Sequence, residues 1–337
     1  MKIYSFVLCF FVVTVAGGQE LESLLGFEHY NNPEILVVTN RLQTNADSLD
    51  FYNQVDTNNA IRAFMVTYSD SAFAIVPSTI KGYIKAHDYP GADYVVFVHG
   101  DGKTFLHAAV RGLDIQNTYG VQVIVFAWPS RRDDGAVISN FTSSLDNLKV
   151  SSGHFDALID SVDQIRSSYL VNNSSAAFTL FLHSLGNEYL PQFVEGSGYL
   201  KIHQPFDNLV INAAAVNSKD HAAWVEKLNI QKQIYINSNA KDVNLNGLRI
   251  ISAYGYLVGE LLLEPVAENA VYVNFTDAIG FKLPPGRSHT YYIGEHVSES
   301  PNVRNYYYEL FHGRQPNLNN KCMFKKRGDV FGWDFIY

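Results

Sequence analysis

The chain has 337 residues, with 47% hydrophobic and 17% charged side chains, a composition that supports a packed core and excludes a disordered chain. Its 33 acidic residues exceed its 25 basic ones, which gives a net charge of −8 with no basic stripe. This balance argues against a surface for nucleic acid, so we expect no nucleic-acid partner.

The N-terminus has the pattern of a secretory signal. Lys2 precedes an almost wholly apolar run, Ile3 to Ala16, which is followed by two glycines. The run is shorter than the roughly 20 residues that a membrane-spanning helix needs. We therefore expect residues 1–18 to be a cleaved signal peptide, with an uncleaved signal anchor as the alternative, and residues 19–337 to form one domain. The mature chain would then have no transmembrane segment and would be secreted, or periplasmic in a bacterium.

Cysteine content limits how the fold can be stabilised. Cys9 lies inside the predicted signal, so Cys322 is the single cysteine of the mature chain and no intrachain disulfide is possible. The fold must be held by burial of apolar surface, which a domain of this size provides.

The pattern of apolar runs changes along the chain. Three short β-rich runs separated by polar turns are typical of antiparallel edge strands; they occupy residues 35–39, 63–68 and 73–76. Longer, near-continuous apolar runs follow at residues 94–99, 121–127, 177–182 and 209–213, with a weaker one at 233–237. Stretches that fit helices lie between them, at about residues 103–118, 153–170, 186–194 and 219–228.

Continuous apolar strands belong to parallel sheets that are buried on both faces. Strands that alternate with helices form a doubly wound sheet. We therefore predict an α/β fold with a doubly wound, mostly parallel sheet and antiparallel N-terminal strands.

The most informative motif is Leu-His-Ser-Leu-Gly-Asn at residues 182–187, because it follows a predicted buried strand and precedes a predicted helix. This is the context of a nucleophile elbow, in which a serine stands on a tight turn above the sheet. Ser184 is therefore the candidate nucleophile, and the main-chain N–H of Leu185 is a candidate oxyanion donor. A small residue is expected two positions before the serine, where this chain has Leu182.

A second oxyanion donor is expected from the loop after an earlier strand, and Val-His-Gly-Asp-Gly at residues 98–102 fits that place. Gly100 allows close approach to a substrate carbonyl, and the N–H of Asp101 is the candidate donor. His99 and Asp101, together with the acids at 133 and 134, lack the spacing of a metal site. We expect no metal and no cofactor.

In α/β sheets with a serine elbow, the acid and then the histidine follow the serine along the chain. Asp242 comes directly after a predicted strand and is the preferred acid, with Asp220 as the fallback. His289 lies on a later predicted loop and is the preferred base. His296 and His312 are the rivals, and His312 follows a stretch that looks helical.

The chain resembles an α/β-hydrolase family of unknown function that is marked by three blocks. These are a strand ending in His-Gly, a strand ending in Trp-Pro-Ser, and His-Ser-Met-Gly-Asn, here at residues 97–100, 126–130 and 183–187. Val-Thr-Asn-Arg at residues 38–41 is similar to a signature near the family's first strand. The resemblance runs from about residue 35 to about residue 315, and it places the acid at Asp242 and the histidine at His289. Arg-Arg-Asp-Asp-Gly at residues 131–135 stands where the family has a tyrosine.

The resemblance implies serine-hydrolase chemistry. Ser184, His289 and Asp242 would form a triad that hydrolyses an ester or other acyl bond through an acyl-enzyme. The expected partner is a small-molecule or lipid-like acyl substrate. The alternative is a catalytically weakened or inactive protein that uses the hydrolase fold for binding, and Leu182 motivates it.

Overall fold

The computed structural model describes residues 30–44, 51–58, 60–69, 72–131, 137–169, 175–196, 202–252, 255–280, 287–328 and 332–336. The predicted signal peptide lies outside these residues. The described strands are β1 (Glu34–Thr39), β2 (Arg41–Gln43), β3 (Phe51–Val55), β4 (Arg62–Ser69), β5 (Ala72–Ser78), β6 (Tyr94–Val98), β7 (Gln122–Phe126), β8 (Phe178–His183), β9 (Phe206–Asn212), β10 (Gln231–Ser238), β11 (Ala270–Asn274), β12 (Phe324–Lys326) and β13 (Trp333–Phe335). The described helices are α2 (Ile80–Ala86), α3 (Phe105–Tyr119), α4 (Val137–Val150), α5 (Ser152–Tyr169), the 3₁₀ helix η3 (Ser184–Glu188), α6 (Tyr189–Glu195), α7 (His221–Val225), α8 (Val243–Ser252), α9 (Thr276–Ile279), α10 (Glu295–Glu299) and α11 (Pro301–Phe311).

One large sheet forms the centre of the molecule. Its strands run in the order β12-β13-β11-β10-β9-β8-β6-β7-β1-β4-β5, and β2 and β3 form a separate ribbon. All neighbours from β13 to β1 pair in parallel. The pairs β12–β13, β1–β4 and β4–β5 are antiparallel. The mostly parallel sheet with antiparallel N-terminal strands is therefore confirmed.

The position of β1 corrects one detail of the sequence prediction. β1 pairs antiparallel with β4 but parallel with β7, so it lies inside the sheet and not at an edge. Ile35 to Val38 are completely buried. This run of four apolar residues is the pattern of a strand that is covered on both faces. Of the three strands predicted at an edge, β4 and β5 have the half-buried pattern of outer strands.

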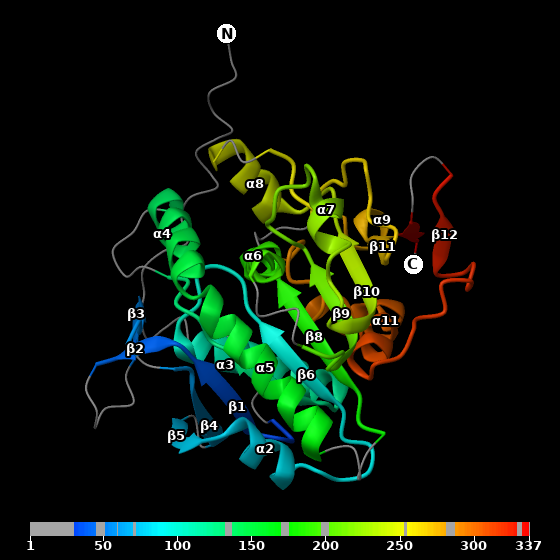
Figure 1. The fold of residues 1–337 in the computed structure, drawn as a ribbon. Coiled ribbons are helices and arrows are strands. Elements are labelled where there is room, and N and C mark those ends of the chain that lie inside the picture. Colours follow the sequence, from blue (N-terminus) through cyan, green and yellow to red (C-terminus); the bar gives the residue numbers. More distant parts are fainter. Residues whose placement is uncertain are drawn as a thin grey trace.

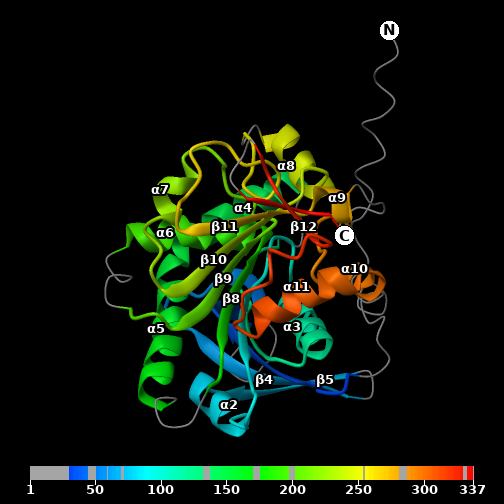
Figure 2. The same cartoon turned by 90° about the vertical axis from the view of Figure 1, so that its right-hand side faces the viewer.

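Helices cover both faces of the sheet. Figure 2 shows α5, α6 and α7 on one side and α3, α10 and α11 on the other. The parallel strands all point toward the edge near α6 and α8, where the arrowheads lie in Figure 1. Because the carboxyl ends of parallel strands meet at one edge, residues that follow β6, β7, β8 and β10 are brought together there.

Several elements were not predicted from the sequence. β11 and β13 extend the parallel sheet beyond β10, and β12 closes that edge. Helix α4 occupies most of the segment that follows the Trp-Pro-Ser block. The sequence signal is weak for β12 and β13, which are three residues long, and for α4, which carries many polar side chains.

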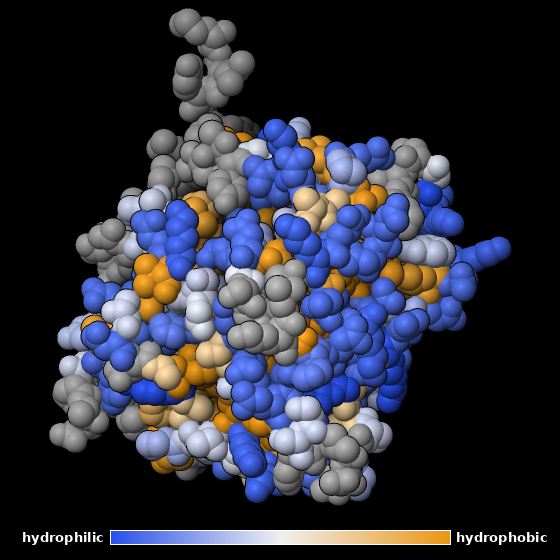
Figure 3. Space-filling view, viewed as in Figure 1, coloured by the Kyte–Doolittle hydropathy of each residue, from blue (hydrophilic) through white to orange (hydrophobic). Residues whose placement is uncertain are grey.

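The face of the molecule that is seen in Figure 1 is largely polar. Figure 3 shows mostly hydrophilic residues with small, scattered apolar patches on the face seen in Figure 1. Among the described residues, none of the helices has the length and apolar character required to cross a membrane. Cys322 is an exposed free thiol.

Candidate active site

Ser184 lies on a tight turn between β8 and η3. Its φ angle of 54° is in the left-handed region, which is uncommon for a residue with a side chain and is found at functional turns. Two glycines make room for this turn. A Cβ on Gly100 would lie 2.6 Å from Ser184 Cβ, and a Cβ on Gly186 would lie 2.6 Å from the carbonyl oxygen of His99. The loop that follows β6 therefore packs directly against Ser184.

Leu182 is the departure from the small residue expected before the serine. It is fully buried in β8, where it pairs with Val98 of β6 and Ile211 of β9. The alanines at 213–215 are buried as well, and Ala215 N–H donates to the Ser184 carbonyl oxygen (3.1 Å). The strand–turn–helix geometry forms with leucine in place.

The structure brings Asp242 and His289 together. His289 Nδ1 lies 2.6 Å from Asp242 Oδ2, and both residues are buried. The other carboxylate oxygen of Asp242 accepts the N–H groups of Asn244 (2.9 Å) and Leu245 (3.1 Å) at the start of α8. This carboxylate therefore has fixed donors on both oxygens, and His289 is the only donor of these that comes from another part of the chain.

A second histidine connects this pair to the serine turn. His183, which precedes Ser184, has its ring 4.5 Å from the His289 ring, centroid to centroid. Its Nε2 lies 3.2 Å from the His289 carbonyl oxygen, which can only accept a hydrogen bond. Burial holds the pKa of His183 well below its ordinary value, and nearby His289 acts in the same direction. His183 is therefore a neutral donor that fixes the main chain of His289.

The distance between serine and histidine is longer than a hydrogen bond. Among the described residues, Ser184 Oγ has no hydrogen bond, and 8% of the Ser184 surface remains exposed. Catalytic contacts of this type are often loose before substrate binds.

The other candidate residues lie elsewhere or have other contacts. Asp220 is exposed and has a φ angle of 60° before α7. His312 contacts Asp93 Oδ2 (2.6 Å) and the Tyr119 carbonyl oxygen, beside the beginning of β6 and so at the opposite end of the strands from Ser184. His296 binds the Arg287 carbonyl oxygen in the segment that carries His289.

The two proposed oxyanion donors flank the serine. Leu185 is the second residue of η3, whose first turn has no side-chain cap, so its N–H is one of the free donors of a helix start. Asp101 follows Gly100 in the loop against Ser184. Its N–H has no hydrogen-bond acceptor within the part of the chain that the structure describes.

Two of the residues considered for a metal, His99 and Asp101, have other partners, and the acids at 133 and 134 lie outside the described residues. Burial lowers the pKa of His99 to about 3, and its Nδ1 lies 2.8 Å from the Gly100 carbonyl oxygen. The Asp101 carboxylate accepts hydrogen bonds from Asn140 and Ser144 of α4. The described residues contain no group of three or more His, Cys, Asp and Glu side chains that could hold a metal ion.

Three contributors were missed from the sequence. Arg41 is fully buried and donates to the carbonyl oxygens of Lys103 and Trp128, both at 2.6 Å. Asn140 and Ser144 reach the same region from α4. The Thr-Asn-Arg and Trp-Pro-Ser blocks were visible in the sequence, but their contact with the loop after β6 was not.

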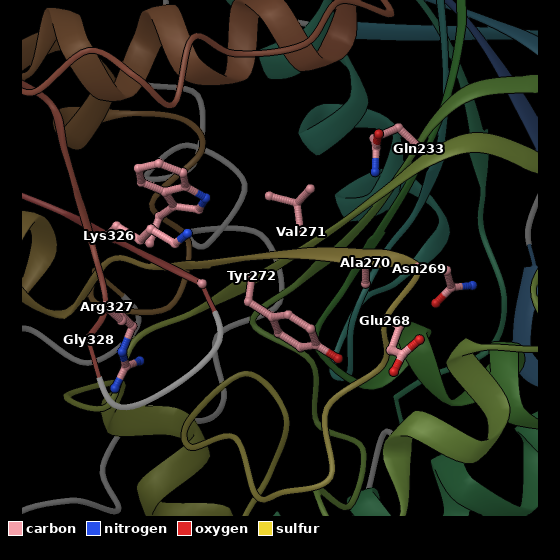
Figure 4. Close-up of a pocket in the computed structure, with 11 residues that line it drawn as sticks. Gln233, Glu268, Asn269, Ala270, Val271, Tyr272, Lys326, Arg327 and Gly328 are labelled. Carbon is pink, nitrogen blue, oxygen red and sulfur yellow. The ribbon is translucent and has the colours of Figure 1, made fainter.

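A separate hollow of about 640 Å³ lies beside β11, three strands along the sheet from β8. Figure 4 shows its wall, which includes Tyr272, Glu268, Lys326 and Arg327. No proposed catalytic residue lines it. Its place beside β11 separates it from the chemistry at Ser184.

Comparisons with known proteins show a family but no close relative. A search of curated proteins found no match. Among solved structures, phospholipase PlaB from Legionella pneumophila aligns with 16% identity over 50% of this chain and 30% of the enzyme, at a TM-score of 0.21. Pyridoxal kinase from Entamoeba histolytica aligns with 13% identity over 49% of this chain and 62% of the kinase, at a TM-score of 0.20. Overlaps at this level do not establish a shared fold, and this chain spans less than a third of the phospholipase.

A family model gives the clearer result. The family described as "Alpha/beta hydrolase of unknown function (DUF900)" matches residues 82–252. This segment is half of the chain and contains Ser184 and Asp242, whereas His289 lies beyond it. The sheet around the segment is mostly parallel, and Ser184 and Asp242 follow the carboxyl ends of β8 and β10, where ligands of open α/β sheets bind. The chain therefore belongs to this family of α/β hydrolases.

Proposed function

We propose that the protein is a serine hydrolase that cleaves an ester or other acyl bond. The observation that carries the proposal is the Asp242–His289 pair, at 2.6 Å, held beside the left-handed turn of Ser184. Three groups from separate segments converge at the carboxyl edge of the sheet. Nucleophilic catalysis by a serine requires such an arrangement, and this supports the proposal.

The chemistry follows from the hydrogen bonds. His289 Nδ1–H donates to the Asp242 carboxylate, so Nε2 is free to accept the hydroxyl proton of Ser184. Ser184 Oγ then attacks the substrate carbonyl carbon, and the N–H groups of Leu185 and Asp101 stabilise the oxyanion. The leaving alcohol takes the proton from His289, and an acyl-enzyme remains. Water, deprotonated by His289, releases the acid and restores Ser184.

The test is labelling by a fluorophosphonate, which reacts with activated serines. We expect the wild-type protein to be labelled at Ser184, as located by peptide mass spectrometry, and Ser184→Ala to be neither labelled nor active toward p-nitrophenyl esters. Loss of a triad member costs about 10⁴-fold or more in rate. Ser298→Ala is the matched control, because Ser298 is an exposed serine on α10.

An unlabelled but folded wild-type protein would favour the second candidate, a hydrolase-fold binding protein. Leu182 is the observation that motivates it, since a bulky residue there can misdirect the serine turn.

Secretion is part of the same proposal. Residues 1–18 should be removed on export, so the mature protein recovered from the medium of a secreting host should begin at Gln19. An intact N-terminus in the membrane fraction would indicate an uncleaved anchor instead.

A further inference from the structure

We propose that Ser144 and Asn140 of α4 are positioning residues for the oxyanion hole. Both hold the side chain of Asp101 and thereby fix the direction of its main-chain N–H. This inference rests on the proposed function, because it assigns a role in the same reaction.

The Asp101 carboxylate is held on both oxygens by α4. Ser144 Oγ lies 2.5 Å from Oδ1, and Asn140 Nδ2 lies 3.0 Å and 2.9 Å from the two oxygens. Burial raises the pKa of the Asp101 carboxyl group, whereas the hydrogen bonds from Ser144 and Asn140 act in the opposite direction. The aspartate thus sits where an unpaired carboxylate would be costly, and its partners fix it in one place.

The side chains of Ser144 and Asn140 also bind Ser130, in the segment that follows β7. Ser144 Oγ lies 2.9 Å and Asn140 Nδ2 lies 3.4 Å from the carbonyl oxygen of Ser130. That oxygen accepts the N–H of Gly102 (2.7 Å), and Ser130 Oγ accepts the N–H of Lys103 (3.0 Å). Through Ser130, helix α4 is therefore connected to Gly102 and Lys103, the two residues that follow Asp101.

Arg41 and Trp128 hold the same loop by further hydrogen bonds. Arg41 binds the carbonyl oxygens of Lys103 and Trp128, and Trp128 Nε1 donates to the His99 carbonyl oxygen (2.8 Å). These contacts anchor the two ends of the loop, at His99 and Lys103. The Asp101 side chain is the attachment at its middle.

The position of the Asp101 N–H, in the middle of the loop, decides whether it can stabilise an oxyanion. Gly100 packs against Ser184, and Asp101 is the next residue, with its N–H unused by the described chain. An oxyanion donor contributes only when it lies about 3 Å from the developing charge. Releasing the Asp101 side chain frees this peptide to rotate, and a displacement of about 1 Å is enough to weaken catalysis.

The experiment compares Ser144→Ala and Asn140→Ala with Asn147→Ala. Asn147 is the matched control, because its Nδ2 binds the Pro129 carbonyl oxygen (3.0 Å) from the same helix without touching Asp101. The readouts are kcat and KM for p-nitrophenyl butyrate, together with the thermal midpoint.

We expect Ser144→Ala and Asn140→Ala to lower kcat about 10- to 100-fold with KM unchanged, less than the roughly 100- to 1000-fold cost of losing an oxyanion donor. Asn147→Ala should lower the thermal midpoint and keep kcat within about twofold. Ser144→Thr retains the hydroxyl group and should recover most of kcat.

Equal kcat losses in all three alanine variants would show that α4 acts only through stability and would overturn the proposal. So would unchanged kcat in Ser144→Ala and Asn140→Ala. If wild type is neither labelled at Ser184 nor active, the proposed function fails, and this assignment fails with it. An active wild type with unaffected Ser144→Ala and Asn140→Ala refutes the positioning role alone.

Discussion

Replacing Leu182 by glycine tests how the serine turn tolerates a bulky residue. Leu182 is fully buried between Val98 and Ile211. Truncating a buried leucine to alanine costs about 2 to 5 kcal/mol, depending on how far the cavity collapses, and glycine in a strand adds about 0.5 to 1 kcal/mol. We therefore expect Leu182→Gly to lose at least about 2 kcal/mol of unfolding free energy without a gain in activity.

The assay is urea unfolding combined with the rate of fluorophosphonate labelling. Leu180→Gly is the matched control. Leu180 is equally buried on the same face of β8 but lies two residues farther from the turn. Both variants should unfold at lower urea, with an unchanged slope. Leu182→Gly should label no faster than wild type. A Leu182→Gly protein that is both stable and markedly faster would refute this reasoning and favour an enzyme weakened by its own leucine.

Three further predictions concern the site and its surroundings. Gly100→Ala places a methyl group 2.6 Å from Ser184 Cβ, so kcat should fall about 100-fold in a protein that still folds; an unchanged rate would contradict the close approach. Asp242→Asn should lower kcat about 10⁴-fold because it disfavours the His289 tautomer that leaves Nε2 free, and a loss below tenfold would exclude Asp242 as the acid. Burial raises the pKa of Asp114 from 3.8 to about 6. This carboxyl group therefore stabilises the fold below about pH 4, and the contribution is lost as the pH rises through about 6. Between pH 4 and 7, wild type should lose up to about 3 kcal/mol relative to Asp114→Asn in urea unfolding, and parallel pH profiles would contradict the shift.

The parallel part of the fold was predictable because its strands are unusually apolar. The strands β6, β7 and β8 are buried at every position, so their sequences show continuous apolar runs. β1 has nearly the same pattern, but the sequence predicts an edge strand there, because its parallel partner β7 pairs with it 88 positions later, Leu36 with Ile124. β13, with three residues, is too short for any periodicity to be visible.

The candidate site was predictable where chain order carries the information. A serine after a strand, an acid after a later strand and a histidine after that led to Ser184, Asp242 and His289, and the last two do meet. Their catalytic roles stay predictions. The support around Ser184 was not predictable, because Arg41 binds carbonyl oxygens 62 and 87 positions away. Every residue has a main-chain carbonyl oxygen, so the sequence does not indicate which of them a side chain will bind.

The amide of Asn140 has one more consequence. Residues 140–142, Asn-Phe-Thr, form an acceptor triplet for N-linked glycans, and the sugar would be joined to Nδ2. That nitrogen is the atom that contacts both carboxylate oxygens of Asp101. A glycan would replace one of the two Nδ2 hydrogens and place its bulk beside Asp101, so it would weaken the contact with the carboxylate. In a secretory pathway that adds such glycans, chains that carry sugar at Asn140 are expected to form the least active fraction.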